Sequence, residues 1–165
     1  GQVAAAIRAL PPASVVLIGS SLGAFVAVQT ALAQAASGGA PVERMVLLAP
    51  ALDFSRTRAW DLGDRTLAEW RATGRTNVFH FGFGRVLPLH YELYSDACGY
   101  DCVGAELSMP ILAFQGRRDT AVDPASVEAW AKRRPNVELH MLDDDHQLAA
   151  SLDYIWQAMK GRIGI

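Results

Sequence analysis

The chain has 165 residues, of which 51% are hydrophobic and 19% charged, and its 15 Lys and Arg against 17 Asp and Glu give a net charge of −2. A near-neutral chain of this kind is not built to bind phosphate backbones, so nucleic acid is excluded as the expected partner. The apolar runs are interrupted well short of the roughly 20 residues that cross a bilayer, and the start, GQVAAAIRAL, lacks the features of a secretory signal. We therefore expect one cytoplasmic domain over residues 1–165, with no membrane segment.

Apolar runs of strand length alternate with segments of helical periodicity along the chain, which is the pattern of a parallel sheet flanked by helices. Continuous apolar runs such as SVVLIG predict strands that are buried on both faces. The Ala-rich segment after this run predicts a helix, which SGG at 37–39 ends. The expected fold class is therefore α/β, with a mostly parallel sheet flanked by helices. The expected strands are 14–19, 44–50, 109–116 and 137–142, and the expected helices are 3–10, 22–36, 126–134 and 148–161.

Residues 51–108 break this alternation, and we expect them to form a small helix-plus-hairpin insertion within the domain. Trp60 and Trp70 suggest an amphipathic helix, and the segment 77–93 has alternating aromatic residues on either side of a Gly-rich turn, as in a hairpin. Two interpretations stay open: a second apolar cluster that completes the core, or a lid over a substrate cleft. The aromatic residues suggest an apolar pocket, for which Trp60, Trp70 and Phe81 are the candidate substrate-binding residues.

Cys98 and Cys102 are the two cysteines of the chain. Four residues apart in an expected helix, they are awkwardly placed for a direct disulfide and make only a weak case for a metal or redox site. We expect two free thiols, which fits a reducing compartment.

The stretch GSSLG, Gly19 to Gly23, is an instance of G-x-S-x-G that lies directly between an expected buried strand and an expected helix. A tight turn at this point would expose Ser21 at the carboxyl end of the strand on a strained backbone, with Gly19 and Gly23 giving the helix room to pass close to the strands. It would also leave the amide of Leu22 free to stabilise an oxyanion beside Ser21. The alternative is a plain Gly/Ser turn with a helix cap, but the flanking strand and helix favour a nucleophilic serine.

A serine hydroxyl is a poor nucleophile at neutral pH, so this hypothesis requires a base and a group that orients the base. With this motif an acid and then a histidine follow along the chain, each after a later strand. Asp119 lies just beyond the third expected strand, and His146 lies just beyond the fourth. Asp123 is a rival acid, but it precedes Pro124, where we expect it to cap the next helix.

Other polar residues near these loops have plainer interpretations. The run Asp143 to Asp145 is typical of a solvated turn, although one of its carboxylates could assist the imidazole electrostatically. His140 falls within an expected strand, and His80 and His90 fall in the insertion, so we expect these three histidines to be packing or cleft residues.

The segments GSSLG, FQGRRDTAVDP and DDDHQL, in this order and spacing, resemble their counterparts in the α/β-hydrolase superfamily, and the likeness covers the chain from Val15 onward. Within the superfamily, the short insertion and HYELYSDA are similar to the small bacterial serine esterases called YqiA-like. The resemblance implies an acyl-ester hydrolase in which Ser21 attacks the carbonyl, His146 carries the proton and Asp119 orients the imidazole. It implies a small-molecule ester as substrate and neither a metal nor an organic cofactor.

The chain departs from the family pattern at its start, because it begins at the helix before the GSSLG turn, where the family has earlier strands. We therefore expect an α/β-hydrolase core that is truncated at its N-terminus, with an open sheet edge that a preceding segment or a second copy of the chain would cover. The second oxyanion donor of the family would also lie upstream of Gly1. With Leu22 as the remaining donor, turnover would be lower by about 10²-fold to 10³-fold.

Two functions of different classes follow. The first is a serine carboxylesterase or thioesterase, and the second is a non-catalytic binding or scaffold protein of hydrolase fold. A serine, an aspartate and a histidine at the mouths of three strands favour the enzyme, because a binding module does not need all three. The sequence does not select the acyl group.

Overall fold

The computed structural model describes residues 1–10, 15–53, 66–80 and 83–163. Its main sheet has four parallel strands, in the spatial order β1-β2-β5-β6. This confirms the α/β class expected from the alternation of apolar runs and helical segments. The strands are β1 (Val15–Ser20), β2 (Val42–Leu48), β5 (Ile111–Gly116) and β6 (Val137–Leu142).

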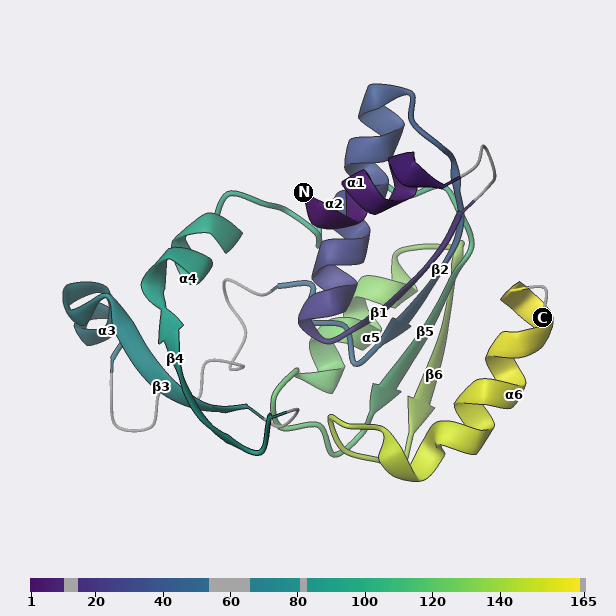
Figure 1. The fold of residues 1–165 in the computed structure, drawn as a ribbon. Coiled ribbons are helices and arrows are strands. Elements are labelled where there is room, and N and C mark those ends of the chain that lie inside the picture. The colour runs from purple at the N-terminus through teal and green to yellow at the C-terminus, as the bar shows by residue number, and fades with distance from the viewer. Residues whose placement is uncertain (11–14, 54–65, 81–82, 164–165) are drawn as a thin grey trace.

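Helices cover both faces of the main sheet, as Figure 1 shows. On one face, α2 (Leu22–Ser37) and α5 (Pro124–Lys132) pack on strand residues such as Met45. On the other face, α6 (Leu152–Ile163) packs on the residues that alternate with these, such as Val46. The strands are continuously apolar because both of their faces are buried. The short helix α1 (Gln2–Ala9) lies against α2, and a 3-10 turn, η2 (Ala149–Ser151), precedes α6.

Local signals account for most element ends. Gly38, at φ 62°, ends α2 in the left-handed conformation that glycine adopts without strain. Asp123 caps α5 by accepting a hydrogen bond from the amide of Ala125 at 3.1 Å, and Pro124 opens that helix, as expected. The second strand ends at Leu48, two residues before the expected position, because Ala49 has a φ of 42°.

The insertion forms a separate small layer, seen beside the main sheet in Figure 1. Its helix α3 (Leu67–Thr73) begins in a capping box between Thr66 and Glu69. An antiparallel hairpin follows, formed by β3 (Arg75–His80) and β4 (Arg85–His90). The expected hairpin ran on to residue 93, but at Tyr91 the chain instead starts a helix, α4 (Tyr91–Ala97), whose last residue is buried in the main core.

The two cysteines are free thiols, as expected, but they do not share a helix. Cys98 is exposed at the end of α4, and Cys102 is buried in the loop that follows. The Cys102 sulfur receives a hydrogen bond from the Gln29 amide at 3.1 Å and lies 3.7 Å from the carbonyl oxygen of Phe25. Burial raises the pKa of the Cys102 thiol to about 11, against the opposing effect of the Gln29 hydrogen bond.

β1 forms one edge of the main sheet, and the side chain of Ile18 in its middle is 53% exposed. The covering of this edge by a second copy or another segment stays a prediction. Within the described residues, every helix is too short or too polar to cross a membrane.

Candidate active site

Ser21 occupies a tight turn between β1 and α2. Its φ of 52° and ψ of −118° are strained for a residue with a side chain, so surrounding contacts must hold this conformation. Its amide donates to the carbonyl oxygen of Leu48 at 2.8 Å, and its own carbonyl accepts from the amides of Ala24 at 3.0 Å and Ala51 at 3.3 Å. The backbone of the neighbouring strand and of the new helix thus holds Ser21 at the carboxyl edge of the sheet.

The two glycines of the GSSLG turn differ in their surroundings. A Cβ on Gly19 would lie 2.4 Å from the carbonyl oxygen of Gly23, so the close passage of α2 over the end of β1 requires glycine at position 19. A Cβ on Gly23 would have no atom within 4 Å. The expectation that both glycines supply room is therefore correct for Gly19 and wrong for Gly23, whose backbone is the group that approaches.

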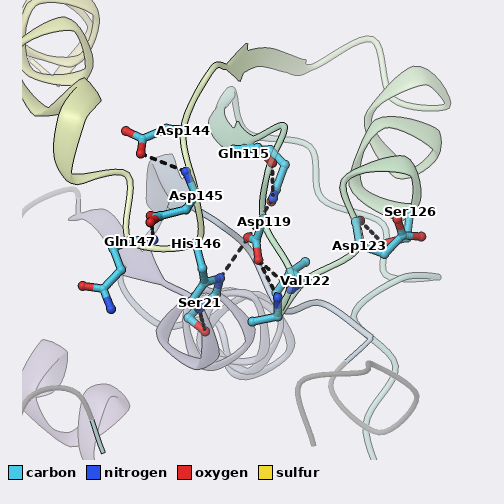
Figure 2. Close-up of polar contacts among 12 residues, drawn as sticks. Ser21, Gln115, Asp119, Val122, Asp123, Ser126, Asp144, Asp145, His146 and Gln147 are labelled. Atoms are coloured by element: carbon cyan, nitrogen blue, oxygen red, sulfur yellow. Dashed lines mark hydrogen bonds and ion pairs between the residues drawn. The ribbon is translucent and has the colours of Figure 1, made fainter. Parts of the chain in front are cut away.

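His146 lies in the loop between β6 and η2 and connects Ser21 to Asp119, as Figure 2 shows. Its Nε2 is 3.0 Å from Oγ of Ser21, a residue 125 positions away in the sequence. Its Nδ1 is 2.9 Å from Oδ2 of Asp119. The three residues that the sequence places after different strands therefore form one continuous hydrogen-bonded chain.

The Asp119 carboxylate is surrounded by donors. Oδ1 accepts from the amides of Ala121 and Val122, each at 2.8 Å, and Oδ2 accepts from Nε2 of Gln115 at 2.8 Å and faces His146. Burial by itself raises the pKa of Asp119, but the hydrogen bonds from His146, Val122 and Gln115 outweigh it, so the pKa lies below its ordinary value. The carboxyl group is therefore ionised at neutral pH and can accept a hydrogen bond from Nδ1–H of His146.

The loop that carries His146 crosses directly over the end of β5. A Cβ on Gly116 would lie 2.4 Å from the carbonyl oxygen of Asp145 and 2.5 Å from that of Asp144, so only glycine permits this crossing. The amide of Arg118 also donates to the carbonyl of Asp144 at 2.9 Å. The close approach brings the loop of His146 against the loop of Asp119.

The carboxylates of the run Asp143 to Asp145 make their hydrogen bonds and ion pair with this loop and its neighbour, and none of these contacts is with the imidazole of His146. Asp143 pairs with Arg118. Asp144 is buried and accepts from the amide of Asp145, and Asp145 accepts from the amide of Gln147. These contacts brace the turn, and the idea that one of the three carboxylates assists the imidazole has no support in them.

The other histidines lie elsewhere. His140 is in β6, with Nδ1 2.7 Å from the Tyr154 hydroxyl of α6 and Nε2 2.8 Å from Glu138, so it joins the sheet to α6. His90 is an exposed residue at the start of α4. The side chain of His80 lies outside the described part of the structure.

The three residues expected to bind substrate have different outcomes. Trp60 and Phe81 lie outside the described residues. Trp70 is 0% exposed, because its ring packs edge-on against Tyr91 and its Nε1 donates to the carbonyl of Leu89 at 3.1 Å. A side chain without exposed surface cannot contact a substrate, so Trp70 is instead the core of the insertion.

A cavity of about 230 Å³ lies along α5, and its lining includes neither Ser21 nor Asp119 nor His146. Two of its lining residues flank Ala51, whose amide bonds to Ser21, and a third is Val122, whose amide bonds to Asp119. Its lining combines apolar residues, such as the buried Trp130, with Asp53, Ser126 and Arg133. Among the described residues no group of three or more His, Cys, Asp or Glu side chains is arranged to hold a metal ion.

Two residues of the site were missed by the sequence reasoning, Gln115 and Gly116. Both lie at the end of the apolar run ILAFQG. Gln115 contacts Asp119 in the loop after this strand, and Gly116 contacts the backbone of the loop that carries His146. The single polar residue in that run was the available signal, because an amide buried among apolar side chains requires a partner.

Comparison with known proteins gives the same fold. The profile of an uncharacterised protein family, UPF0227, matches residues 1–161. A search of curated proteins found no match. The fold is that of the α/β-hydrolase superfamily, which confirms the resemblance seen in the sequence.

Three solved structures illustrate this likeness. A protein of Agrobacterium vitis S4, assigned provisionally as a hydrolase, has a TM-score of 0.74 and 25% identity over 90% of this chain and 60% of its own. Mouse alpha/beta hydrolase domain-containing protein 10 has a TM-score of 0.76 and 17% identity, over 98% of this chain and 66% of its own. Est1E from Butyrivibrio proteoclasticus with ferulic acid bound has a TM-score of 0.76 and 19% identity, over 98% and 63%. The chain thus spans less than two thirds of the length of each.

Proposed function

The chain belongs to family UPF0227, and we propose that it is a serine hydrolase that cleaves carboxylic esters or thioesters through an acyl-enzyme. The observation that carries this proposal is the unbroken hydrogen-bonded chain from Ser21 through His146 to Asp119. A nucleophile, a base and an orienting acid in contact at the carboxyl ends of parallel strands are the parts that acyl transfer requires.

In the first half of the reaction, Oγ of Ser21 bonds to the carbonyl carbon of the ester while its proton passes to Nε2 of His146. The tetrahedral intermediate then breaks its bond to the leaving oxygen or sulfur, which takes the proton from Nε2 and departs. In the second half, water attacks the acyl-enzyme, His146 accepts one of its protons, and that proton returns to Ser21 as the acid leaves. His146 thus acts alternately as base and acid.

Two groups lower the barrier of these steps. The ionised Asp119 keeps the Nδ1 proton of His146 in place, so that Nε2 is free to accept a proton, and it stabilises the imidazolium that forms. The amide of Leu22, the first residue of α2, belongs to the helix turn whose N–H groups have no partner inside the helix, and it is the proposed oxyanion donor.

The substrate is proposed to be a small-molecule ester, as the resemblance to the α/β-hydrolase superfamily implies. The similar structure from Agrobacterium vitis S4 is named provisionally as a hydrolase, which agrees with a hydrolytic function.

Covalent labelling tests the proposal and separates it from a non-catalytic binding role. A fluorophosphonate should label the wild-type protein at one site, and Ser21→Ala should abolish labelling and lower ester turnover by about 10⁶-fold. Ser20→Ala is the matched control, because Ser20 is the exposed neighbour on β1, and it should retain both. A folded wild-type protein that neither labels nor hydrolyses esters would support the binding or scaffold function instead.

A further inference from the structure

Gln115 is the polar exception in the most deeply buried strand of the protein. All six residues of β5 are buried, and Gln115 is 0% exposed. Burying an amide without compensating hydrogen bonds costs free energy that an apolar residue at this position would not. A glutamine here therefore needs a reason beyond packing.

Its amide nitrogen supplies that reason. Nε2 donates to Oδ2 of Asp119 at 2.8 Å and to the carbonyl oxygen of Gly116 at 3.1 Å. Both partners are acceptors, since the carboxylate is ionised, so the nitrogen and not the oxygen of the amide must face them. The other end, Oε1, is buried and has no hydrogen-bond partner among the described residues. The side chain is therefore oriented by Asp119 and Gly116 alone.

The position of this contact bears on the proposed reaction. Oδ1 of Asp119 is held by the backbone of the following turn, and Oδ2, the oxygen that faces the imidazole, has one protein donor besides His146. Without Gln115, the backbone amides of the following turn would still hold Oδ1 of the Asp119 carboxylate. Oδ2 would then keep only its contact with His146, and the carboxylate could pivot about Oδ1 until Oδ2 moves out of line with Nδ1 of His146.

We propose that Gln115 is a positioning residue, which holds Oδ2 of Asp119 against Nδ1 of His146. This inference rests on the proposed function, because it assigns a role within the same hydrogen-bonded chain. Gln115 touches neither substrate nor Ser21, and it acts through Asp119.

The test is Gln115→Met, which keeps the length and volume of the side chain but removes both donors. We expect kcat for a small ester to fall by about 10-fold to 100-fold, the loss typical when an orienting contact is removed, while KM is unchanged because substrate contacts are intact. Gln115→Leu removes the same donors with another shape and serves if methionine is not accommodated.

Gln34→Leu is the matched control. Gln34 is also a buried glutamine, it lies in α2 about 20 Å from Ser21 at 1.5 Å per residue, and its amide nitrogen has no partner among the described residues. Its substitution should leave kcat unchanged. An equal loss of kcat in both variants would mean that burial of an amide, and not its contact with Asp119, matters.

A measurement on the resting protein keeps the two hypotheses apart. The proton between Nδ1 of His146 and Asp119 should give a low-field NMR signal that is absent in Asp119→Asn. Gln115→Met should shift or broaden this signal, and Gln34→Leu should not. An unaltered signal in Gln115→Met overturns the positioning role even if the wild type hydrolyses esters. A wild type that is inert toward esters and phosphonate overturns the proposed function, while the signal still decides whether Gln115 orients Asp119.

Discussion

The main sheet and the insertion of this protein are stabilised in different ways. In the main sheet, parallel strands are buried on both faces, and the side chains of the site sit at strand ends where two or more backbone contacts hold each turn. In the insertion, the strand β4 alternates half-buried and exposed residues, and Val86 at the tip of the hairpin is largely exposed. Its core is the aromatic cluster of Trp70, Tyr91 and Tyr94.

This difference indicates where a substitution can change catalytic activity without changing the stability of the fold, and the reverse. A substitution at the sheet edge alters a hydrogen bond inside a framework that many other contacts hold, so the fold should survive. A substitution at the centre of the aromatic cluster removes most of what holds the insertion together, while the main sheet keeps its own core. The following experiments test that separation.

Asp119→Asn is expected to have the largest effect on activity with little effect on the fold. An amide favours the wrong imidazole tautomer and cannot stabilise an imidazolium, so ester turnover should fall by about 10⁴-fold. The amides of Ala121 and Val122 can still donate to the side-chain oxygen, so circular dichroism should stay close to the wild type. The new amide nitrogen faces the donor of Gln115, so thermal unfolding should show a modest loss of stability.

Asp145→Asn is the control for this change, since Asp145 is adjacent to His146 in sequence but bonds to the amide of Gln147. It should cost far less turnover. The reverse ranking, in folded variants, would remove Asp119 from the proposed mechanism and leave Ser21 and His146 in place.

Trp70→Ala is expected to destabilise the insertion by about 3–5 kcal/mol, the usual cost of removing a buried tryptophan side chain. Hydrogen exchange should show faster exchange of the amides of β3 and β4, while the amides of β5 stay protected. Trp156→Ala, at a tryptophan that is 46% exposed on α6, should change neither. Equal loss of protection in β5 and in the hairpin would show that insertion and sheet unfold as one unit.

The two thiols give the smallest and most local contrast. Cys98 is exposed, whereas Cys102 is buried and, with a pKa raised by burial to about 11, is ionised at pH 8 in roughly one molecule in a thousand. Iodoacetamide at pH 8 should therefore alkylate Cys98 and spare Cys102 until the protein is unfolded, as peptide mass spectrometry would show. Early alkylation of Cys102 would mean that its loop opens in the native state.

The main sheet was largely predictable because its signals are local. A strand buried on both faces is a continuous apolar run, and this pattern located all four strands to within two residues at either end, although β2 ends early where Ala49 turns. The insertion was predicted less well, because aromatic residues at short spacing fit a helix, a hairpin or a core equally. The formation of the helix α4 and the burial of Trp70 depend on contacts between different segments of the insertion.

The sequence by itself determined the α/β class, the turn at Ser21, and the placement of Asp119 and His146 after later strands, because strand, turn and motif signals are written in neighbouring residues. Only the tertiary structure decided that α2 passes close to Gly19 and leaves open space at Gly23. It also decided that the loop of His146 crosses over Gly116 and that Gln115 donates a hydrogen bond to Asp119. The crossing at Gly116 and the hydrogen bond between Ser21 and His146, which are 125 residues apart, depend on distances between atoms of segments that are remote in sequence. Such distances are set by how the strands and helices pack, and no spacing along the chain encodes them.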